Sequence, residues 1–516
     1  MGARARQLAD LCSGIADVST SIRVTDLSLD SRTVSEGGLF LACAGRRTHG
    51  LAALPEAISR GARAVLWEPA PGVSEPIVPS AVHAQSVEKL STVASSLAGK
   101  FFDLPSETLR VAGITGTNGK TTTAWLLAQA LTRCDSKSAY MGTLGVGMAP
   151  DEVVAGEYTT ADAVSVQRQL AAMREAGAEC VAMEVSSHAL DQHRVAGVRF
   201  RVAAFTNLTR DHLDYHGTME AYGAAKARLF DTPKLEAGVI NVDDAFGAEL
   251  ARRHANTLPL TLTARTAAGI ATIDDIRSRA PGVRSLLAAE IKALPEGLSF
   301  TIECREGSLE AARHAVTLPL IGEFNVENAL VTLGLLRALG VALEPALRAL
   351  AECRAPAGRM EALTATGRAL AIVDYAHTPD ALAKSLRAAR AHCRGKLHLV
   401  FGCGGDRDAG KRPLMAGVAA AMADGIVITD DNPRSESAAG IAADIIAGLP
   451  QGIRATVIHD RGEAIRHALA GAREGDVVLV AGKGHENYQI VGAERRPFSD
   501  REIIHSIYGT PDASAR

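Results

Sequence analysis

Short apolar runs alternate with amphipathic stretches along most of the chain. Between residues 109 and 353, each of four apolar runs is followed by a helical pattern, and these runs are VAGITG, CVAMEV, VAAFTNL and GVINV. After residue 354 the alternation begins again with ALAIVDY, KLHLVFG, GIVITD and DVVLVAG. Apolar strands separated by amphipathic helices predict parallel sheets with right-handed crossovers.

The first 108 residues carry a different pattern, with shorter strand-like pieces ahead of a passage rich in proline and serine. These pieces are SIRVTDLSLD, GGLFLACAG and ARAVLWE. The chain has 516 residues, which is too long for one hydrophobic core. We therefore predict three α/β domains, over residues 1–108, 109–353 and 354–516.

A glycine-rich loop follows the first apolar run of the middle segment. Residues 111–123 read VAGITGTNGKTTT and lead into the helix-forming AWLLAQAL. Such a loop turns backbone N–H groups toward phosphate oxygens, with the lysine on the β- and γ-phosphates and the hydroxyl on Mg²⁺. Ile114 stands where the usual pattern has glycine, yet the setting favours ATP binding. The predicted nucleotide-binding residues of the loop are Gly116, Thr117, Asn118, Gly119, Lys120, Thr121 and Thr122.

Composition limits the remaining possibilities. The net charge is −3 and aromatic residues make up 4% of the chain, so neither nucleic acid nor an anionic membrane is an expected partner. The eight cysteines are scattered without a C-x-x-C pair, which favours buried thiols in a reducing compartment. No apolar run is long enough for a membrane span or a secretion signal. We expect a cytoplasmic protein.

Polar residues gather where the predicted strands end. In open parallel sheets, ligands bind beyond the carboxyl ends of the strands. Any one of these polar strand ends could be an ordinary solvated loop, but seven such ends are poorly explained as solvated loops alone. Besides the phosphate loop, they are EVSSH (184–188), NLTRDH (207–212), DYAH (374–377), GCGGDR (402–407), DNPR (431–434) and GKGHE (482–486).

Three side chains in the middle segment are candidates for chemistry. Glu184 ends an apolar run, so a buried carboxylate is expected there, with Mg²⁺ as a compensating charge. His212 is either a metal ligand or a hydrogen-bonded loop histidine. Lys226 is expected to share a helix face with Tyr222, Leu229 and Phe230, and these apolar surroundings would lower its pKa and leave a neutral amine able to take up CO₂ as a carbamate. A surface lysine with a buried stem is the alternative, and the residues alone favour it.

The motifs GTNGKTT, MEVSSHAL, TNLTRDHLDYHG, AYGAAKARLF, GEFNVENAL, DYAHTPDAL, GGDRD, DNPR and GKGHE follow one another in the order typical of one family. In this the chain resembles the Mur ligase family over nearly its whole length. The resemblance implies a UDP-sugar-binding domain, a central P-loop ATPase domain with a mainly parallel sheet, and a C-terminal Rossmann-like domain that binds an amino acid. It also implies ATP-dependent amide-bond formation through an acyl phosphate in peptidoglycan precursor synthesis, with Mg²⁺ as cofactor. We expect a monomer.

The resemblance also assigns roles to single positions. It places Lys120 on the phosphates, Thr121, Glu184 and His212 on Mg²⁺, and a carbamylated lysine (N6-carboxylysine) at Lys226, which reverses the preference drawn from the residues alone. Residues that hold the nucleotide or couple domain closure would be Asn325, Asn328, Arg359 and Asp374. The sugar dipeptide UDP-MurNAc-L-Ala-D-Glu would contact Leu29, Ser31, Arg46, Arg47, Thr159, Thr160, Ser186, Gln192 and Arg194.

The DNPR motif indicates which amino acid is added. Members that add meso-diaminopimelate must hold a distal carboxylate that lysine lacks, and an arginine fork matches a carboxylate. Arginines would then bind the carboxylates and Glu486 an ammonium group. The expected diaminopimelate site consists of Arg407, Asp431, Asn432, Pro433, Arg434, Gly482 and Glu486.

Three other functions stay open at this point. Folylpolyglutamate synthetases share the fold and the acyl-phosphate chemistry but lack the DNPR and GKGHE pair. An ATP-binding regulator without ligase activity would have no use for Lys120, Glu184, His212 and Lys226 together. Within the family, an enzyme that adds L-lysine is the nearest alternative.

Overall fold

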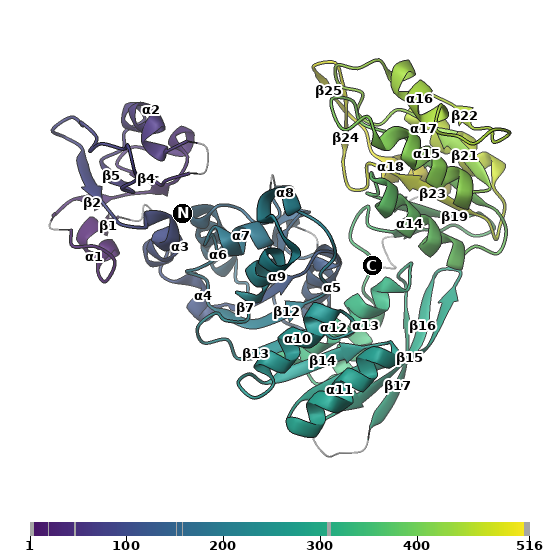
Figure 1. The fold of residues 1–516 in the computed structure, drawn as a ribbon, viewed down its shortest axis with the longest axis horizontal. Helices are drawn as coiled ribbons and strands as arrows, with labels where there is room; N and C mark the ends of the chain where they lie inside the picture. Colours follow the sequence, from purple (N-terminus) through teal and green to yellow (C-terminus); the bar gives the residue numbers. More distant parts are fainter. Residues whose placement is uncertain are drawn as a thin grey trace. The chain divides into compact units, whose positions relative to one another are not determined.

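The computed structural model describes residues 5–18, 20–45, 48–150, 152–156, 158–306 and 311–509 (Figure 1). The chain divides into two compact units. The first contains residues 1–262, 274–283 and 334–341, and the second contains residues 263–273, 284–333 and 342–516. Because this division differs from three consecutive segments, the predicted domain boundaries stay a prediction.

The first unit begins with a small parallel sheet in the order β3-β4-β5-β6, next to an antiparallel pair of β1 and β2. Along β4, Leu39 and Leu41 pack into one apolar cluster while Phe40 and Ala42 pack into another, so both faces of the sheet are covered. The elements are β1 (Arg6–Gln7), α1 (Leu8–Cys12), β2 (Arg23–Val24), β3 (Leu27–Ser28), η1 (Ser31–Thr33), β4 (Leu39–Ala42), η2 (Gly50–Ala53), α2 (Leu54–Ser59), β5 (Ala64–Trp67), β6 (His83–Ser86), α3 (Leu90–Phe101) and α4 (Pro105–Thr108).

A second, larger sheet of this unit carries the phosphate loop. Its strands run in the order β10-β9-β8-β11-β7-β12-β13-β14, with β8, β11, β7, β12 and β13 parallel and β9 and β10 antiparallel. The phosphate-loop strand β7 is central and fully flanked, which is why its residues are apolar on both faces. The elements are β7 (Arg110–Thr115), α5 (Lys120–Arg133), β8 (Ser138–Gly142), β9 (Gly145–Met148), β10 (Glu152–Val154), α6 (Ala163–Glu175), β11 (Cys180–Glu184), α7 (Ser187–Asp191), β12 (Phe200–Phe205), α8 (Leu213–His216), α9 (Met219–Ala227), β13 (Ala237–Asn241) and α10 (Ala245–His254).

Three elements contribute residues to both units: β14 (Leu260–Ala264), α11 (Ala267–Arg279) and α12 (Phe324–Ala338). The second unit contains an antiparallel ribbon of β15 (Arg284–Leu294), β16 (Gly297–Arg305) and β17 (Ala312–Leu318), followed by α13 (Leu343–Ala351).

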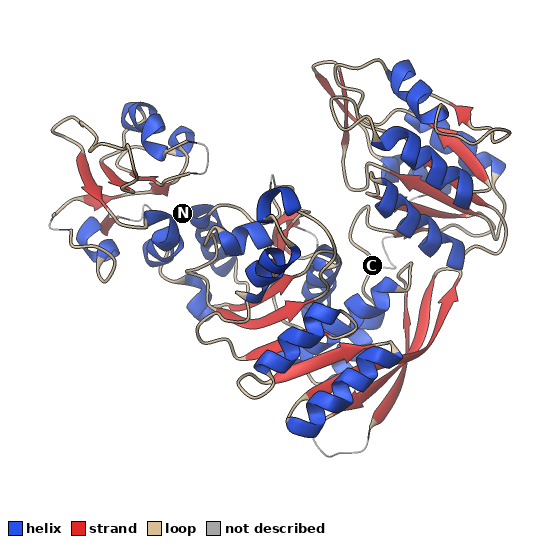
Figure 2. Ribbon diagram, viewed as in Figure 1, coloured by secondary structure: helices blue, strands red, loops and turns tan. Residues whose placement is uncertain are grey.

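The last sheet has the order β18-β19-β23-β20-β21-β22, parallel except for β18. Along β20, Leu399 and Phe401 pack with α14, α15 and α16, while Val400 packs with α17 and α18, so helices cover both faces (Figure 2). The elements are β18 (Glu361–Leu363), β19 (Leu370–Asp374), α14 (Pro379–Ala391), β20 (Leu397–Phe401), α15 (Lys411–Met422), β21 (Gly425–Ile428), α16 (Ala438–Ile446), β22 (Thr456–Val457), α17 (Arg461–Gly471), β23 (Val477–Ala481), β24 (Tyr488–Val491), β25 (Glu494–Pro497) and α18 (Asp500–Tyr508).

The predicted α/β fold class is confirmed, and each apolar run named above forms a strand. All eight cysteines have free thiols, as the scattered spacing predicts. Across the part of the chain that the structure describes, no helix combines the length and the apolar character that crossing a membrane requires.

Candidate active site

The phosphate loop has a backbone that only glycine allows at two positions. Gly116 and Gly119 have φ values of 146° and 83°, and a Cβ at Gly116 would lie 1.9 Å from Oγ1 of Thr206. Helix α5 starts directly after the loop, at Lys120. The Lys120 Nζ donates to the carbonyl oxygens of Gly116 at 2.9 Å and Thr117 at 2.8 Å. The loop is thus folded with its lysine lying over it, as a phosphate cradle requires.

Glu184 lies at the end of β11, next to the start of α5. Its side chain is fully buried, and Oε2 accepts a hydrogen bond from the Thr121 hydroxyl at 2.9 Å. The Tyr140 hydroxyl and the Thr143 backbone N–H donate to Oε1. The expected buried carboxylate is therefore present, and neutral hydrogen-bond donors already stabilise it.

Lys226 is buried on α9, with 1% of its surface exposed. Its Nζ donates to the carbonyl oxygen of Gly116 at 2.7 Å and lies 4.3 Å from the ring centroid of Tyr222. The interpretation as a surface lysine is therefore wrong. The helix ends at Ala227, so the expected helical neighbours Leu229 and Phe230 lie beyond it.

The carbonyl oxygen of Gly116 thus accepts hydrogen bonds from two lysines, Lys120 and Lys226. Two ammonium groups this close, one of them buried, repel each other. Burial, and then the charge of Lys120, lower the pKa of Lys226 from 10.5 to about 6, while Asp211 acts in the opposite direction. The predicted lowering of this pKa is confirmed, and Lys226 is a neutral amine at neutral pH.

His212 lies just before α8, with φ of 52° and 47% of its side chain exposed. Its Nε2 is 3.5 Å from Oδ2 of Asp211, and its ring is 4.9 Å from the ring of His188. Burial, together with the neighbouring histidines His212 and His216, lowers the pKa of His188. Both descriptions of His212, as a loop histidine and as a metal ligand, fit this exposed position.

The donors around Glu184 fit Mg²⁺ by their chemistry, since the Glu184 carboxylate and the Thr121 hydroxyl are both oxygen ligands. A Cβ at Gly142 would lie 2.2 Å from Oε1 of Glu184, so a glycine leaves the carboxylate its space. Within the described ranges, no three His, Cys, Asp or Glu side chains are grouped as a metal site.

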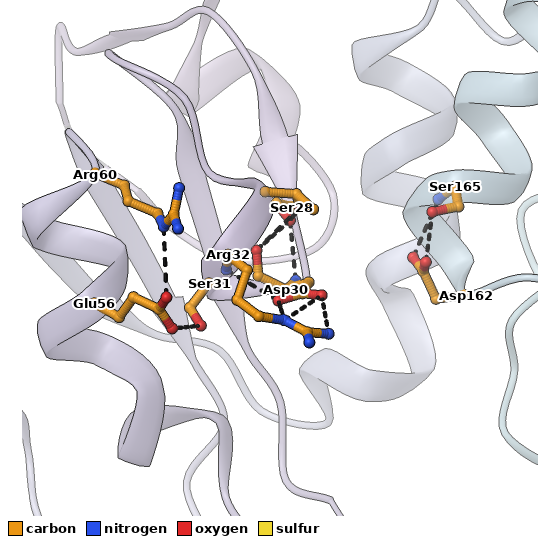
Figure 3. A network of polar contacts seen from close by, with 9 residues as sticks. Ser28, Asp30, Ser31, Arg32, Glu56, Arg60, Asp162 and Ser165 are labelled. Atoms are coloured by element: carbon orange, nitrogen blue, oxygen red, sulfur yellow. Dashed lines mark hydrogen bonds and ion pairs between the residues drawn. The ribbon is translucent and has the colours of Figure 1, made fainter. Parts of the chain in front are cut away.

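A cavity of about 1050 Å³ opens between the small sheet and α6 of the first unit. Five of the predicted sugar-dipeptide residues line it: Leu29, Thr159, Thr160, Gln192 and Arg194. Asp30 and Arg32 line it from the start of η1, and Asp162 and Ser165 from the start of α6 (Figure 3).

Two further predicted residues of this set, Ser31 and Ser186, are not among the residues that line the cavity. The Ser31 hydroxyl donates to Oε2 of Glu56 at 2.7 Å, a contact that Figure 3 shows. Ser186 caps α7 by accepting from the Ala189 N–H. Arg46 and Arg47 lie outside the described residues.

A chain of hydrogen bonds orders one wall of the cavity. Arg194 donates to the Thr160 carbonyl oxygen at 2.9 Å and to Oε1 of Gln192. The Gln192 amide in turn donates to the Tyr215 hydroxyl at 2.9 Å. Thr160 donates to the Glu184 carbonyl oxygen at 3.0 Å, which connects this wall to the buried carboxylate.

The other predicted nucleotide residues belong to the second unit. Asn325 and Asn328 are buried on α12, where the Asn328 amide donates to Oδ1 of Asn325 at 2.8 Å. Asp374 accepts from the Met360 N–H and the Ser385 hydroxyl. The Arg359 guanidinium lies 4.9 Å from the ring centroid of Tyr375.

Four of the motif loops extend from the carboxyl ends of neighbouring parallel strands in the last sheet. The Asn432 amide donates to Oε2 of Glu486 at 3.0 Å, so the DNPR and GKGHE motifs meet as predicted. Asp431 is buried, and burial raises the pKa of its carboxyl group, which the charge of Arg461 opposes. Gly482 has φ of 119°, and a Cβ there would lie 2.6 Å from Oδ2 of Asp431.

Arg434 has an unusual backbone for an arginine, with φ of 52°. Its N–H donates to the Ile490 carbonyl oxygen at 3.1 Å, and its Nη1 donates to the Gly405 carbonyl oxygen at 2.8 Å. Pro433 before it is buried, and Arg407 is exposed. A left-handed conformation held by the surrounding chain often marks a functional position.

Sequence reasoning missed three residues that shape these sites. Tyr140 and Thr143 hold Glu184, but they lie on or after a different strand and carried no motif. Lys483 stands inside GKGHE and contacts both Asn432 and Glu486, so its position between Gly482 and Glu486 was a usable signal.

Comparison with known proteins gives a consistent result. Three family models match consecutive parts of the chain: the Mur ligase family catalytic domain at residues 23–96, the Mur ligase middle domain at residues 114–336, and the Mur ligase glutamate ligase domain at residues 358–484.

Similar proteins cover nearly the whole chain. A UDP-N-acetylmuramoyl-L-alanyl-D-glutamate--2,6-diaminopimelate ligase of Pseudomonas aeruginosa is 46% identical over 93% of this chain and 94% of its own. The protein of the same name from Alkalilimnicola ehrlichii is 46% identical over 95% and 96%. A solved structure of a ligase of this name has a TM-score of 0.71 at 33% identity and covers 98% of this chain and 100% of its own.

Replacing Lys226 by methionine tests its buried neutral state. Between pH 6 and about 10.4, the ordinary lysine value, the unfolded chain binds a proton at Lys226 that the folded chain lacks, so the lysine destabilises the fold. We expect Lys226→Met to raise the midpoint of thermal unfolding by several degrees at pH 7. The difference should be largest below pH 6, where the charged amine is buried in the folded state, and should vanish above about pH 10.4, where the amine is neutral in both states.

Calorimetry in buffers free of CO₂ measures this difference at several pH values. Lys384→Met serves as the control, since Lys384 is 49% exposed on α14 and should show no such pH-dependent gain. A Lys226→Met midpoint below that of the parent protein at pH 7 would contradict the neutral buried amine.

Proposed function

The chain belongs to the Mur ligase family, and we propose that it is the ATP-dependent ligase that adds meso-2,6-diaminopimelate to UDP-N-acetylmuramoyl-L-alanyl-D-glutamate in the cytoplasm. The observation that carries the proposal is the joint presence of a phosphate cradle with Lys120 over it and the buried Glu184 bonded to Thr121. The relatives that share 46% of their residues with the chain support the choice of substrates.

The first step activates a carboxylate. An oxygen of the D-glutamate γ-carboxylate attacks the γ-phosphorus of ATP, the bond to the ADP oxygen breaks, and an acyl phosphate forms. Such a transfer needs alignment and charge neutralisation more than covalent help from the protein. Lys120 supplies a positive charge at the loop, and the loop N–H groups orient the phosphates.

Mg²⁺ would be held by Thr121, Glu184 and His212, together with phosphate oxygens. When bound, it neutralises charge that develops on the transferred phosphoryl group. Glu184 is kept in place for this role by Tyr140 and Thr143.

Lys226 is proposed as a carbamate. Its neutral Nζ attacks the carbon of CO₂, a nitrogen–carbon bond forms, one carbonyl electron pair moves to oxygen, and the nitrogen releases a proton to water. The product is an anion beside the Lys120 ammonium, so the two groups attract each other. Its burial beside Gly116 supports this assignment.

The second step forms the amide. An amine of diaminopimelate attacks the acyl carbon, a tetrahedral intermediate collapses, and phosphate leaves with the oxygen that came from the carboxylate. Glu486 would hold an ammonium group of the amino acid, and Arg434 and Arg407 its carboxylates. The Asn432–Glu486 hydrogen bond supports a common site for the two motifs.

Phosphate release from ATP in the presence of the UDP-linked dipeptide tests the function. We expect release with meso-diaminopimelate and little with L-lysine, because a site built for a distal carboxylate is left with an unpaired charge when that group is missing. Turnover with lysine alone would overturn the choice of amino acid, and no turnover with either would overturn the ligase assignment.

Replacing Lys226 by alanine tests the carbamate. We expect Lys226→Ala to lose nearly all ligase activity and to regain part of it with added short carboxylates such as acetate, which restore the anion. Lys120→Ala should not be rescued in this way, because that residue supplies a cation. Full activity of Lys226→Ala without any additive would remove the carbamate from the mechanism.

Replacing Arg434 tests amino-acid selection. Loss of a charged partner of the distal carboxylate should lower kcat/KM for diaminopimelate roughly 100-fold or more and change that for lysine little. The kcat/KM of Arg434→Lys for diaminopimelate should lie between those of Arg434→Ala and the parent protein, since lysine keeps the charge but cannot form the two parallel hydrogen bonds of a guanidinium group. Arg387→Ala on the exposed side of α14 is the control. Equal losses for both amino acids would contradict the role of Arg434 in selection.

A further inference from the structure

Lys483 is fully buried among the C-terminal loops although it carries an amine. Its Nζ donates to Oδ1 of Asn432 and to Oε2 of Glu486, both at 3.1 Å, and lies 5.6 Å from the ring centroid of Tyr488. A buried ammonium is costly unless its partners are well placed. Because no part of its side chain reaches the surface, Lys483 can act on a bound amino acid only through its neighbours.

The first effect of Lys483 is on the side-chain amide of Asn432. With an ammonium donor on one side, the amide must turn its oxygen toward Lys483, which leaves its nitrogen to donate to Glu486. The same oxygen also accepts from the Ile490 N–H at 2.9 Å. The orientation of Asn432 is therefore fixed by two donors.

Ile490 extends this arrangement to Arg434. Its carbonyl oxygen accepts from the Arg434 N–H at 3.1 Å, and the Gly492 N–H donates to the Arg434 carbonyl oxygen at 2.7 Å. The hairpin of β24 and β25 thus holds Arg434 in its left-handed backbone conformation while it is tied to Asn432. A change at Lys483 reaches Arg434 through Asn432 and Ile490.

The second effect of Lys483 is on Glu486. Both Lys483 and Asn432 donate to its Oε2, and among the described residues none donates a hydrogen bond to Oε1. This arrangement leaves Oε1 as the acceptor for an incoming ammonium group.

We propose that Lys483 is a positioning residue of the amino-acid site: it sets the orientation of Asn432 and Glu486 and, through Ile490, the place of Arg434, and so determines affinity and selectivity for a diamino diacid. This inference rests on the proposed function, because it names what makes that site selective. Lys483 itself does not touch the amino acid.

The test compares Lys483→Met with the parent protein in phosphate-release assays, varying each of the three substrates in turn. Methionine replaces the apolar part of the lysine side chain with an unbranched chain of similar length and removes the charge. We expect KM for diaminopimelate to rise roughly 10- to 100-fold while KM for ATP and for the UDP-linked dipeptide stays within about twofold. Selectivity for diaminopimelate over lysine should fall. Lys483→Gln, which keeps a donor without a charge, should show a smaller rise, and Lys384→Met should change none of these values.

Several outcomes would overturn the inference. An unchanged KM for diaminopimelate in Lys483→Met, or equal rises for all three substrates, would show that the lysine does not position the amino-acid site. Loss of the folded state in both Lys483 variants would make it a structural residue. A parent protein that turns over lysine but not diaminopimelate would instead refute the proposed substrate. If the parent protein is selective for diaminopimelate and Lys483→Met has the same KM and the same selectivity, only the role of Lys483 is refuted, and the proposed function stands.

Discussion

The carbonyl oxygen of Gly116 accepts hydrogen bonds from two lysine side chains, and the arrangement around the phosphate loop depends on this shared contact. The position must be glycine, because its φ of 146° and the close approach of Thr206 leave no room for a side chain. Lys120 comes from the helix after the loop and Lys226 from α9. The contact therefore joins the phosphate loop to a distant helix and leaves one of the two amines neutral.

The carboxylates of Glu184 and Glu486 are held in a similar way at the two sites. Glu184 is buried at a strand end and is held by neutral donors from Thr121, Tyr140 and Thr143. Glu486 is held by an amide and an ammonium group. In both cases the partners hold the carboxylate in one orientation, which is what an electrostatic site requires before its ligand arrives.

The sequence predicted the strands and their polar ends well because these signals are local. Apolar runs bounded by glycine or acidic residues became β7, β11, β19 and β23, and the phosphate loop lies where its glycines indicated. The burial of Lys226 could not be read from its helix, since the contact that decides it comes from Gly116, more than a hundred residues away. Local periodicity also placed Leu229 on a helix that ends at Ala227.

The same limit applies to the partners of a carboxylate. Tyr140 reaches Glu184 from the neighbouring strand β8, and only the strand order brings the two together. Lys483 was visible inside a motif, yet its role depends on the hairpin that carries Ile490. Residue types and spacing thus identify a site, while the tertiary fold decides which side chains hold it in position.

Transfer of an oxygen atom from substrate to phosphate tests the central claim most directly. The UDP-linked dipeptide would carry ¹⁸O in both oxygens of the D-glutamate γ-carboxylate, and phosphate would be collected after turnover with ATP and meso-diaminopimelate. An acyl phosphate requires one labelled oxygen in each phosphate released, because the attacking carboxylate oxygen leaves with the phosphoryl group. Phosphate without label, released while amide forms, would contradict activation of the carboxylate by ATP.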